Sequence, residues 1–431
     1  MAGSTEAAAE GVAEGEQGSS SFLGGWTAPN HEASDALAEL RRRMQAVIGG
    51  PEGAPVSRAH GSLPFDAVER PEGRLWLRQV TLPFDFAVGR AAAQPARAAA
   101  PELLALLGLD ASLSAAPPER ALYFDTETTG LGVGAGTVAF LIGVGWFGAA
   151  GLTLEQLFVR EPADEPAALG YLRERAEGAS LLISFNGKAF DWPLLLDRYV
   201  MNQLPPPAAR PHLDLLHVAR RLHRARLGSC RLQVLEREVL GFTREGDVEG
   251  AEIAARYAHF LRSGDEGALT QVVQHNLWDV ASMVALVGLY GEPLEALHPL
   301  DLVGAARTFQ RGNNMAAAQA AAERALARGA GAPGLELTAR LAKARGDRAR
   351  ALRDFEALTR EVDDPAVRLE LAKLYEHHAR DPLRALGQVE AGTGEEPRAT
   401  EKRRARLTKK LDRQLAEAAA RIQRARRAAA H

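Results

Sequence analysis

The hydrophobic pattern in the middle of the chain predicts a mixed β-sheet with helices packed on it. Three apolar runs separated by glycine-rich turns have the length of strands and form an antiparallel meander: 121–127, 137–147 and 152–159. A similar run over 74–82 precedes them and is joined to them by an Ala-rich connector. After a helical pattern that ends at Gly178, the fully apolar run 181–185 is typical of a buried strand reached by a helical crossover.

The second half of the chain is predicted to be helical. Apolar residues recur at helical spacing over four segments: 213–223, 232–240, 252–261 and about 268–290. Past Pro293 the chain becomes rich in Ala, Arg and Leu and contains a loose repeat. Arg311-Gly312-Asn313 recurs as Arg345-Gly346-Asp347 and Ala379-Arg380-Asp381, with Ala317, Ala351 and Ala385 at the same distance after each. A period of 34 residues is the tetratricopeptide length and predicts stacked helical hairpins, the alternative being accidental similarity in an Ala-rich helical region.

The two ends of the chain differ in charge. Residues 1–33 are rich in Ala, Glu, Gly and Ser, which predicts disorder, and a short helical pattern from Ser34 stops at Gly49-Gly50-Pro51. Residues 397–431 carry twelve Lys and Arg against three acids and predict a long basic helix. Such a helix can be a solvated cap on the repeats or a phosphate-binding arm, and the sequence leaves both open.

Composition excludes several classes of protein. A net charge of −3 does not predict bulk attraction to nucleic acid or to a membrane surface. Cys230 is the single cysteine, which rules out an internal disulfide and favours a reducing cytoplasm. We expect no secretory signal, because the N-terminus is acidic and lacks an apolar core. The uncharged stretch 130–154 has the length of a membrane span, but its glycines favour two strands and their turns.

Candidate chemistry begins with Asp125 and Glu127 at the end of a predicted strand. Alternate side chains of a strand share a face, so the two carboxylates should point the same way. Their repulsion is relieved by a divalent cation, and oxygen ligands suit magnesium or manganese. The alternative is a strand that ends in a polar turn.

Two further acidic sites follow. Asp191 closes the stretch Asn186-Gly187-Lys188-Ala189-Phe190-Asp191, where Pro193 places it at or near the N-cap of a helix. His275 and Asp279 lie inside a helical pattern with i, i+4 spacing and so share one face. A capping aspartate and a solvent-exposed helix face are the corresponding structural alternatives.

The order of these motifs resembles the DEDD exonucleases, the DnaQ-like branch of the ribonuclease H-like fold. The segments Phe124-Asp125-Thr126-Glu127, Asn186–Asp191 and His275-Asn276-Leu277-Trp278-Asp279 are most similar to YprB-type ribonuclease H-like proteins, and the tetratricopeptide-like tail also fits that group. The resemblance implies that four acids hold two Mg²⁺ or Mn²⁺ ions, Asp125, Glu127, Asp191 and Asp279, and that His275 is the general base. His275 has three residues between it and Asp279, whereas the histidine subclass has four, so the spacing departs from that subclass at this position. Thr128 and Asn186 are expected to contact the substrate, although Asn186 can equally cap the turn.

The sequence as a whole therefore predicts a metal-dependent nuclease with a helical-repeat domain. Five regions are expected: a disordered tail (1–33), an N-terminal extension (34–118), a ribonuclease H-like α/β domain (119–295), tetratricopeptide-like repeats (300–395) and a basic helix (396–431). We expect a cytoplasmic 3′–5′ exonuclease on single-stranded DNA or RNA, with a possible protein partner on the repeats and no membrane association. The alternatives are a nucleic-acid-binding adaptor and an endonuclease on structured substrates.

Overall fold

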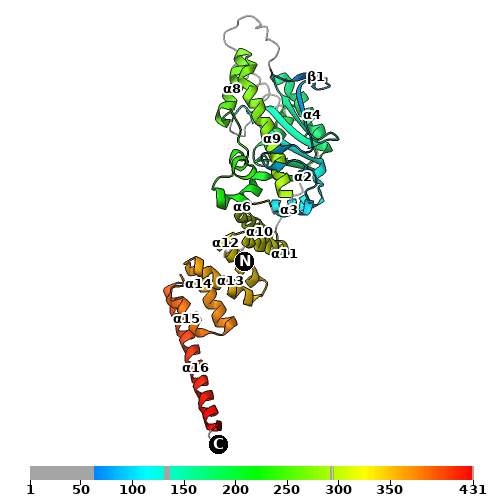
Figure 1. Ribbon diagram of the computed structural model, residues 1–431. Coiled ribbons are helices and arrows are strands. Elements are labelled where there is room, and N and C mark those ends of the chain that lie inside the picture. The colour runs from blue at the N-terminus through cyan, green and yellow to red at the C-terminus, as the bar shows by residue number, and fades with distance from the viewer. Residues whose placement is uncertain (1–62, 131–135, 292–293, 295, 430–431) are drawn as a thin grey trace, which may run out of the picture.

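The computed structural model describes residues 63–130, 136–291, 294 and 296–429. A sheet with helices on both faces occupies one end of the molecule, and a succession of helices leads to α16 (Pro397–Ala429) at the other end (Figure 1). The tail 1–33 and the short helix expected before Gly49 lie outside the described residues.

Seven strands form the main sheet, in the order β1-β2-β7-β6-β5-β8-β9. Their bounds are β1 (Asp66–Arg70), β2 (Gly73–Leu82), β5 (Ala121–Thr128), β6 (Ala139–Phe147), β7 (Leu152–Phe158), β8 (Leu181–Ser184) and β9 (His212–Asp214). Neighbours from β1 to β5 are antiparallel, whereas β5, β8 and β9 run parallel. A separate two-stranded ribbon pairs β3 (Ala87–Val88) with β4 (Ala91–Ala92). The predicted mixed sheet is confirmed, and β1 and β2 extend it on the side of β7.

Alternation along β5 sends its side chains into two different cores. Leu122 and Phe124 pack with α4 (Glu165–Gly178) and α5 (Asp191–Met201) on one face. Tyr123 packs on the other face with α9 (Thr270–Gly291) and with residues from the helices around it. Asp125 and Glu127 continue the Tyr123 side of the strand and therefore face α9.

Two glycines of β6 let α9 approach the sheet closely. A Cβ at Gly143 would lie 2.4 Å from Asn276 Oδ1, and one at Gly145 would lie 2.8 Å from Val280 Cγ1. Both distances are shorter than real Cβ contacts, so a larger residue at either position would force the facing side chains or the helix to shift. Because Gly143 pairs with Asp125 across the ladder, this close approach sets α9 over the acidic strand.

Several sequence expectations need correction around the sheet. A strand, β9, begins at His212, where a helix was expected to start at 213, and α6 spans Leu215–Leu227. Three residues are too few to show a period of two, so the strand had no visible pattern. Strand β1 was not predicted either. The Ala-rich connector contains α2 (Gln94–Arg97) and α3 (Pro101–Gly108).

The remaining predicted helices are present with shifted ends. α7 (Leu232–Leu235) continues into a π-helical turn, Glu236–Leu240, and α8 spans Gly250–Ser263. Within the described residues, one helical stretch, Glu266–Gly291, has the length and hydropathy of a membrane span. Because 72% of its most apolar window is buried inside the protein, it has the character of a core helix.

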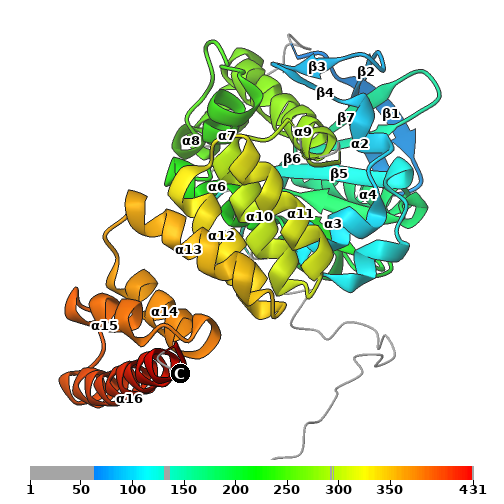
Figure 2. The same cartoon turned by 60° about the horizontal axis from the view of Figure 1, so that its bottom comes forward.

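Helical hairpins follow the sheet (Figure 2). Their helices are α10 (Pro299–Arg311), α11 (Met315–Ala327), α12 (Gly331–Ala344), α13 (Arg348–Glu361), α14 (Pro365–Leu374) and α15 (Pro382–Glu390). The first hairpin packs directly on the sheet-bearing part, since Leu302 and Phe309 share a core with α6 and α9. A Cβ at Gly304 would lie 2.6 Å from the Leu222 carbonyl oxygen, which shows how close α10 and α6 are.

The three hairpin turns share one geometry. Each has a left-handed residue followed by a side-chain N-cap and, four residues after the cap, a fully buried alanine: Asn313/Asn314/Ala318, Gly346/Asp347/Ala351 and Arg380/Asp381/Ala385. Asp347 therefore corresponds to Asn314, and the expected alignment with Asn313 and Ala317 is one residue out at the first turn. The spacing is 33 residues and then 34, so the repeat is real but not strictly periodic.

The first half of α16 closes the hairpins. Leu407 is fully buried in a hydrophobic cluster with residues of α12, α13, α14 and α15. Nearby, Glu376 accepts hydrogen bonds from Arg406 Nε and Lys410 Nζ, each at 2.7 Å. The hydrogen bond from Arg406, together with that from Lys410, lowers the pKa of Glu376 to about 2 although its burial opposes this. This half of the basic helix thus packs against the last helical hairpin.

Candidate active site

Asp125 is held by an amide on α9. Asn276, which is fully buried, donates from Nδ2 to Asp125 Oδ2 at 3.0 Å. Its Oδ1 accepts from Gln156 Nε2 at 3.0 Å, so the orientation of the amide is fixed from β7. Burial, followed by the charges of Asp279, Glu127 and Asp191, raises the pKa of Asp125 well above its usual value.

Glu127 has a buried oxygen without a hydrogen-bond partner among the described residues. This atom, Oε1, lies 4.0 Å from His275 Nε2, beyond hydrogen-bonding distance. Burial, with repulsion from Asp279 and Asp191, raises the pKa of Glu127 well above its usual value. A buried carboxylate in this state is costly unless a cation joins it.

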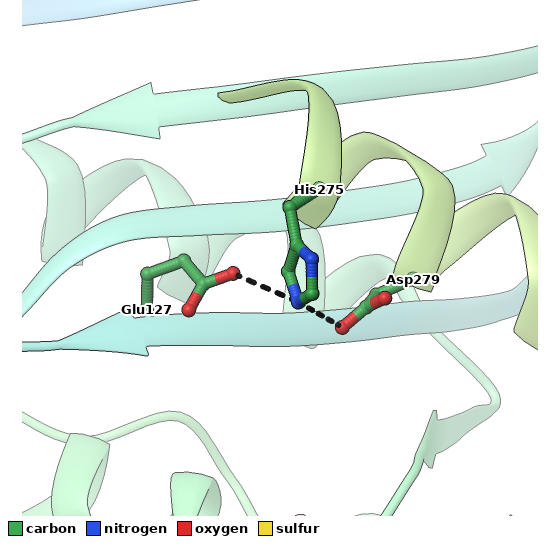
Figure 3. Close-up of side chains that lie close together, drawn as sticks. All are labelled: Glu127, His275 and Asp279. Carbon is green, nitrogen blue, oxygen red and sulfur yellow. Dashed lines mark ion pairs between the residues drawn. The ribbon is translucent and has the colours of Figure 1, made fainter. Parts of the chain in front are cut away.

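His275 and Asp279 share one face of α9, as their spacing predicts. Nε2 of His275 lies 3.5 Å from Asp279 Oδ2, and ligand atoms of Glu127, His275 and Asp279 all lie within 4.8 Å of one another (Figure 3). The alternative of an exposed face is wrong, because the His275 and Asp279 side chains are 11% and 16% exposed.

Asp247 orients the imidazole from a loop between α7 and α8. Its Oδ1 lies 2.7 Å from His275 Nδ1. Burial alone would raise the pKa of Asp247, but the hydrogen bond and charge of His275 lower it. Because this bond engages Nδ1, the second nitrogen, Nε2, is the one turned toward the carboxylates.

Arg244, from the same loop, contacts one carboxylate oxygen of Asp279. Its guanidinium contacts Asp279 Oδ1 and donates to Glu236 Oε1 at 2.5 Å and Oε2 at 2.9 Å. The Arg244 side chain is 5% exposed. Burial alone would lower its pKa, but the charges of Asp279 and Glu236 raise it above the usual value. Arg244 therefore stays charged and fixes one oxygen of Asp279.

Asp191 reaches the site from the other face of the sheet. It is the first residue of α5, and Phe190, rather than Asp191, stands at the N-cap. Thr126, which points away from Asp125 on β5, donates its hydroxyl to Asp191 Oδ1. Burial raises the pKa of Asp191 to about 6, and the charges of Asp214 and Asp279 add to the effect.

The two predicted substrate residues have local roles as well. Asn186 adopts a left-handed conformation (φ 70°), and its backbone N–H donates to Asp214 Oδ1 at 2.9 Å. It also lines a cavity together with Asp125 and Asp279. Thr128 donates its hydroxyl to the Gly130 carbonyl at 2.7 Å, which uses that hydroxyl in the turn after β5.

Three residues that contact the site were not predicted as site residues: Arg244, Asp247 and Asn276. The first two occupy a charged loop that has the composition of a solvated connection, so its sequence carries no sign of burial. Asn276 belongs to the segment His275–Asp279, but only the packing against Gly143 shows that it contacts Asp125.

The donor set fits a divalent cation. The orphaned Glu127 oxygen and the raised pKa values of Asp125 and Glu127 indicate uncompensated negative charge, and the oxygen donors are those that Mg²⁺ and Mn²⁺ prefer. Asp125, Glu127, Asp191 and Asp279 would hold such ions.

Comparison with known proteins agrees with the fold. Residues 122–290 match the family model described as the RNase_H superfamily. The fold is ribonuclease H-like, followed by an all-helical region, and it supports a nuclease-type function. Nucleases with this fold usually use divalent metals, in agreement with the acidic cluster.

Among the proteins similar to this chain are one sequence relative and one solved structure. One is "Uncharacterized protein YprB" of Bacillus subtilis (strain 168), 37% identical over 166 residues, which are 38% of this chain and 40% of that protein. The matched region thus spans well under half of the relative. The other is the family B DNA polymerase from the hyperthermophilic archaeon Pyrobaculum calidifontis, with 16% identity over 53% of this chain and 29% of the polymerase. Its TM-score of 0.33 is too low to support an argument.

Proposed function

We propose that this chain is a metal-dependent nuclease of the DEDD type, a 3′–5′ exonuclease on single-stranded DNA or RNA. The observation that carries the proposal is the cluster of Glu127, His275 and Asp279, in which the buried Glu127 Oε1 has no hydrogen-bond partner among the described residues. The charges of Glu127 and Asp279 also act, together with that of Asp191, on Asp125.

Different side chains would have different roles in hydrolysis. With Nδ1 engaged by Asp247, His275 presents Nε2 to the acids and can take a proton from the attacking water. Asn276 and Thr126 hold Asp125 and Asp191, and Arg244 holds Asp279, so three of the four carboxylates are oriented before substrate arrives. Two Mg²⁺ or Mn²⁺ ions held by the four carboxylates would activate that water and stabilise the leaving oxygen.

A single strand is the favoured substrate because of the space beside the acids. The cavity next to Asp125 and Asp279 has a volume of about 700 Å³. This lies in the range of pockets for individual small ligands, and so fits a nucleotide of one strand rather than a duplex.

We also propose that the hairpins are tetratricopeptide-like and bind a protein segment. The three matching turns and buried alanines support this assignment. Because the first hairpin shares a core with α6 and α9, the nuclease and repeat functions would be mechanically joined. A cytoplasmic location stays a prediction.

A direct assay tests the nuclease. Full-length protein with Mn²⁺ or Mg²⁺ is incubated with 5′-labelled single- and double-stranded DNA and RNA, and with circular single strands. We expect stepwise shortening of linear single strands from the 3′ end and intact circles. Asp125→Asn and Glu127→Gln should each abolish cleavage.

The control is Asp197→Asn, an exposed acid on α5, which should cleave normally. Cleavage of circles would indicate the endonuclease alternative. Equal turnover by wild type and Asp125→Asn would refute the site, and binding without cleavage under all metals would favour the adaptor alternative.

A further inference from the structure

The cavity beside the acids has a strongly basic wall. Arg220 and Arg224 of α6 line it together with Arg231, just before α7, and Asp125 and Asp279 also line it. The two α6 arginines are one helical turn apart and so project from the same face. All three are exposed.

These arginines have no visible structural task. Within the described residues, none of the three side chains forms a hydrogen bond or ion pair. Other arginines of α6 are used in the fold: Arg226 makes a two-pronged contact to Asp301 at 3.0 and 2.6 Å, and Arg221 donates to the Leu107 carbonyl at 2.7 Å. On α6, Arg221 and Arg226 are thus used to hold the fold together, whereas Arg220 and Arg224 line the cavity.

Apolar side chains complete the lining. Phe185, Leu216 and Leu232 border the cavity, and Phe185 is only partly buried. Free guanidinium groups, a partly accessible aromatic ring and the carboxylates of Asp125 and Asp279 match the parts of a nucleic-acid strand: phosphates, bases and the bond to be cut. A small anion would need the cations but not the apolar wall.

We propose that Arg220, Arg224 and Arg231 bind the phosphates of a single nucleic-acid strand that crosses α6 to reach the acids, with Phe185 against a base. The proposal rests on the nuclease function and names the path of its substrate. It also gives the main phosphate contacts to α6 rather than to α16, which lies at the far end of the molecule (Figure 1).

Salt dependence gives the expected size of the effect. On single strands each neutralised phosphate contributes about −0.7 to the slope of log affinity against log salt. Replacing the three arginines should therefore flatten the slope by about 2 and weaken binding about tenfold or more at low salt. The maximal cleavage rate should change little, because the carboxylates and His275 are untouched, while KM rises.

Binding is measured by fluorescence anisotropy with short labelled oligo-dT and oligo-U, over a salt series. All proteins are full-length and carry Asp125→Asn, so no strand is cut. The test variant adds Arg220→Ala, Arg224→Ala and Arg231→Ala. The matched control adds Arg348→Ala, Arg353→Ala and Arg360→Ala, which removes the same charge from exposed positions of α13. A third variant replaces the cavity arginines with Lys.

We expect the flattened slope in the test variant, an unchanged slope in the control, and a largely restored slope with Lys, since that residue keeps the charge. The same slope and affinity in the test variant and the control, or a background protein that does not bind either oligonucleotide, overturns the proposal. If the slopes are as expected but the wild-type protein never cleaves, the nuclease function is refuted and the strand path still stands.

Discussion

Asp191 offers a quantitative test of the site through stability rather than activity. In the metal-free protein burial raises its pKa to about 6, against an ordinary value of 3.8. Its protonated form therefore stabilises the fold fully below pH 3.8, and this contribution is lost as the pH rises through 6. The two values differ by about 2.2 pH units (6 − 3.8), equivalent to about 3 kcal/mol at the upper limit.

Asparagine at this position is neutral at all pH values and still accepts a hydrogen bond from Thr126. Asp191→Asn should therefore raise the free energy of unfolding of metal-free protein by up to about 3 kcal/mol at pH 8 and change it little at pH 4. For a domain of this size the gain corresponds to a rise of about 6–12 °C in Tm.

Tryptophan fluorescence follows the relevant part of the chain, because all five tryptophans precede residue 300. Melts are recorded in EDTA at pH 4, 6 and 8, with Asp197→Asn as the control for a charge lost from the exposed side of α5. A variant no more stable than wild type at pH 8, or one equally stabilised at pH 4, would refute the reasoning.

Four further results are expected. Millimolar Mn²⁺ should stabilise the wild type by about 2.7 kcal/mol at a hundredfold excess over Kd and so raise its Tm. Asp279→Asn should reduce that rise in the same melts. Asp247→Asn should lower kcat about 10–100-fold in the cleavage assay with KM nearly unchanged, since the residue orients His275 without reaching substrate. Gly143→Ala should destabilise the protein by about 1–3 kcal/mol in urea melts, whereas Gly178→Ala, with nothing within 4 Å of its new Cβ, should not. Leu407→Ala should cost about 2–4 kcal/mol by circular dichroism, whereas Leu415→Ala, 61% exposed, should be nearly neutral.

Local sequence determined the parts of this protein that depend on spacing. The two-residue alternation on β5 put Asp125 and Glu127 on one face, and the i, i+4 spacing put His275 beside Asp279, because backbone geometry fixes these relations within a single element. The hairpin turns were visible for the same reason: a left-handed residue and an Asx cap are local solutions to ending one helix and starting the next.

Only the tertiary structure decided what lies across from those elements. Nothing in the sequence around Asp247 or Arg244 separates them from a solvated loop, yet folding buries Arg244 against Asp279 and places Asp247 on His275. Likewise Arg220 and Arg226 are the same residue type on the same helix, and only the position of Asp301 makes one a structural anchor and leaves the other facing the cavity. The physical reason is that burial and pairing are set by contacts distant in sequence, made possible here by the close approach of α9 to Gly143 and of α10 to α6.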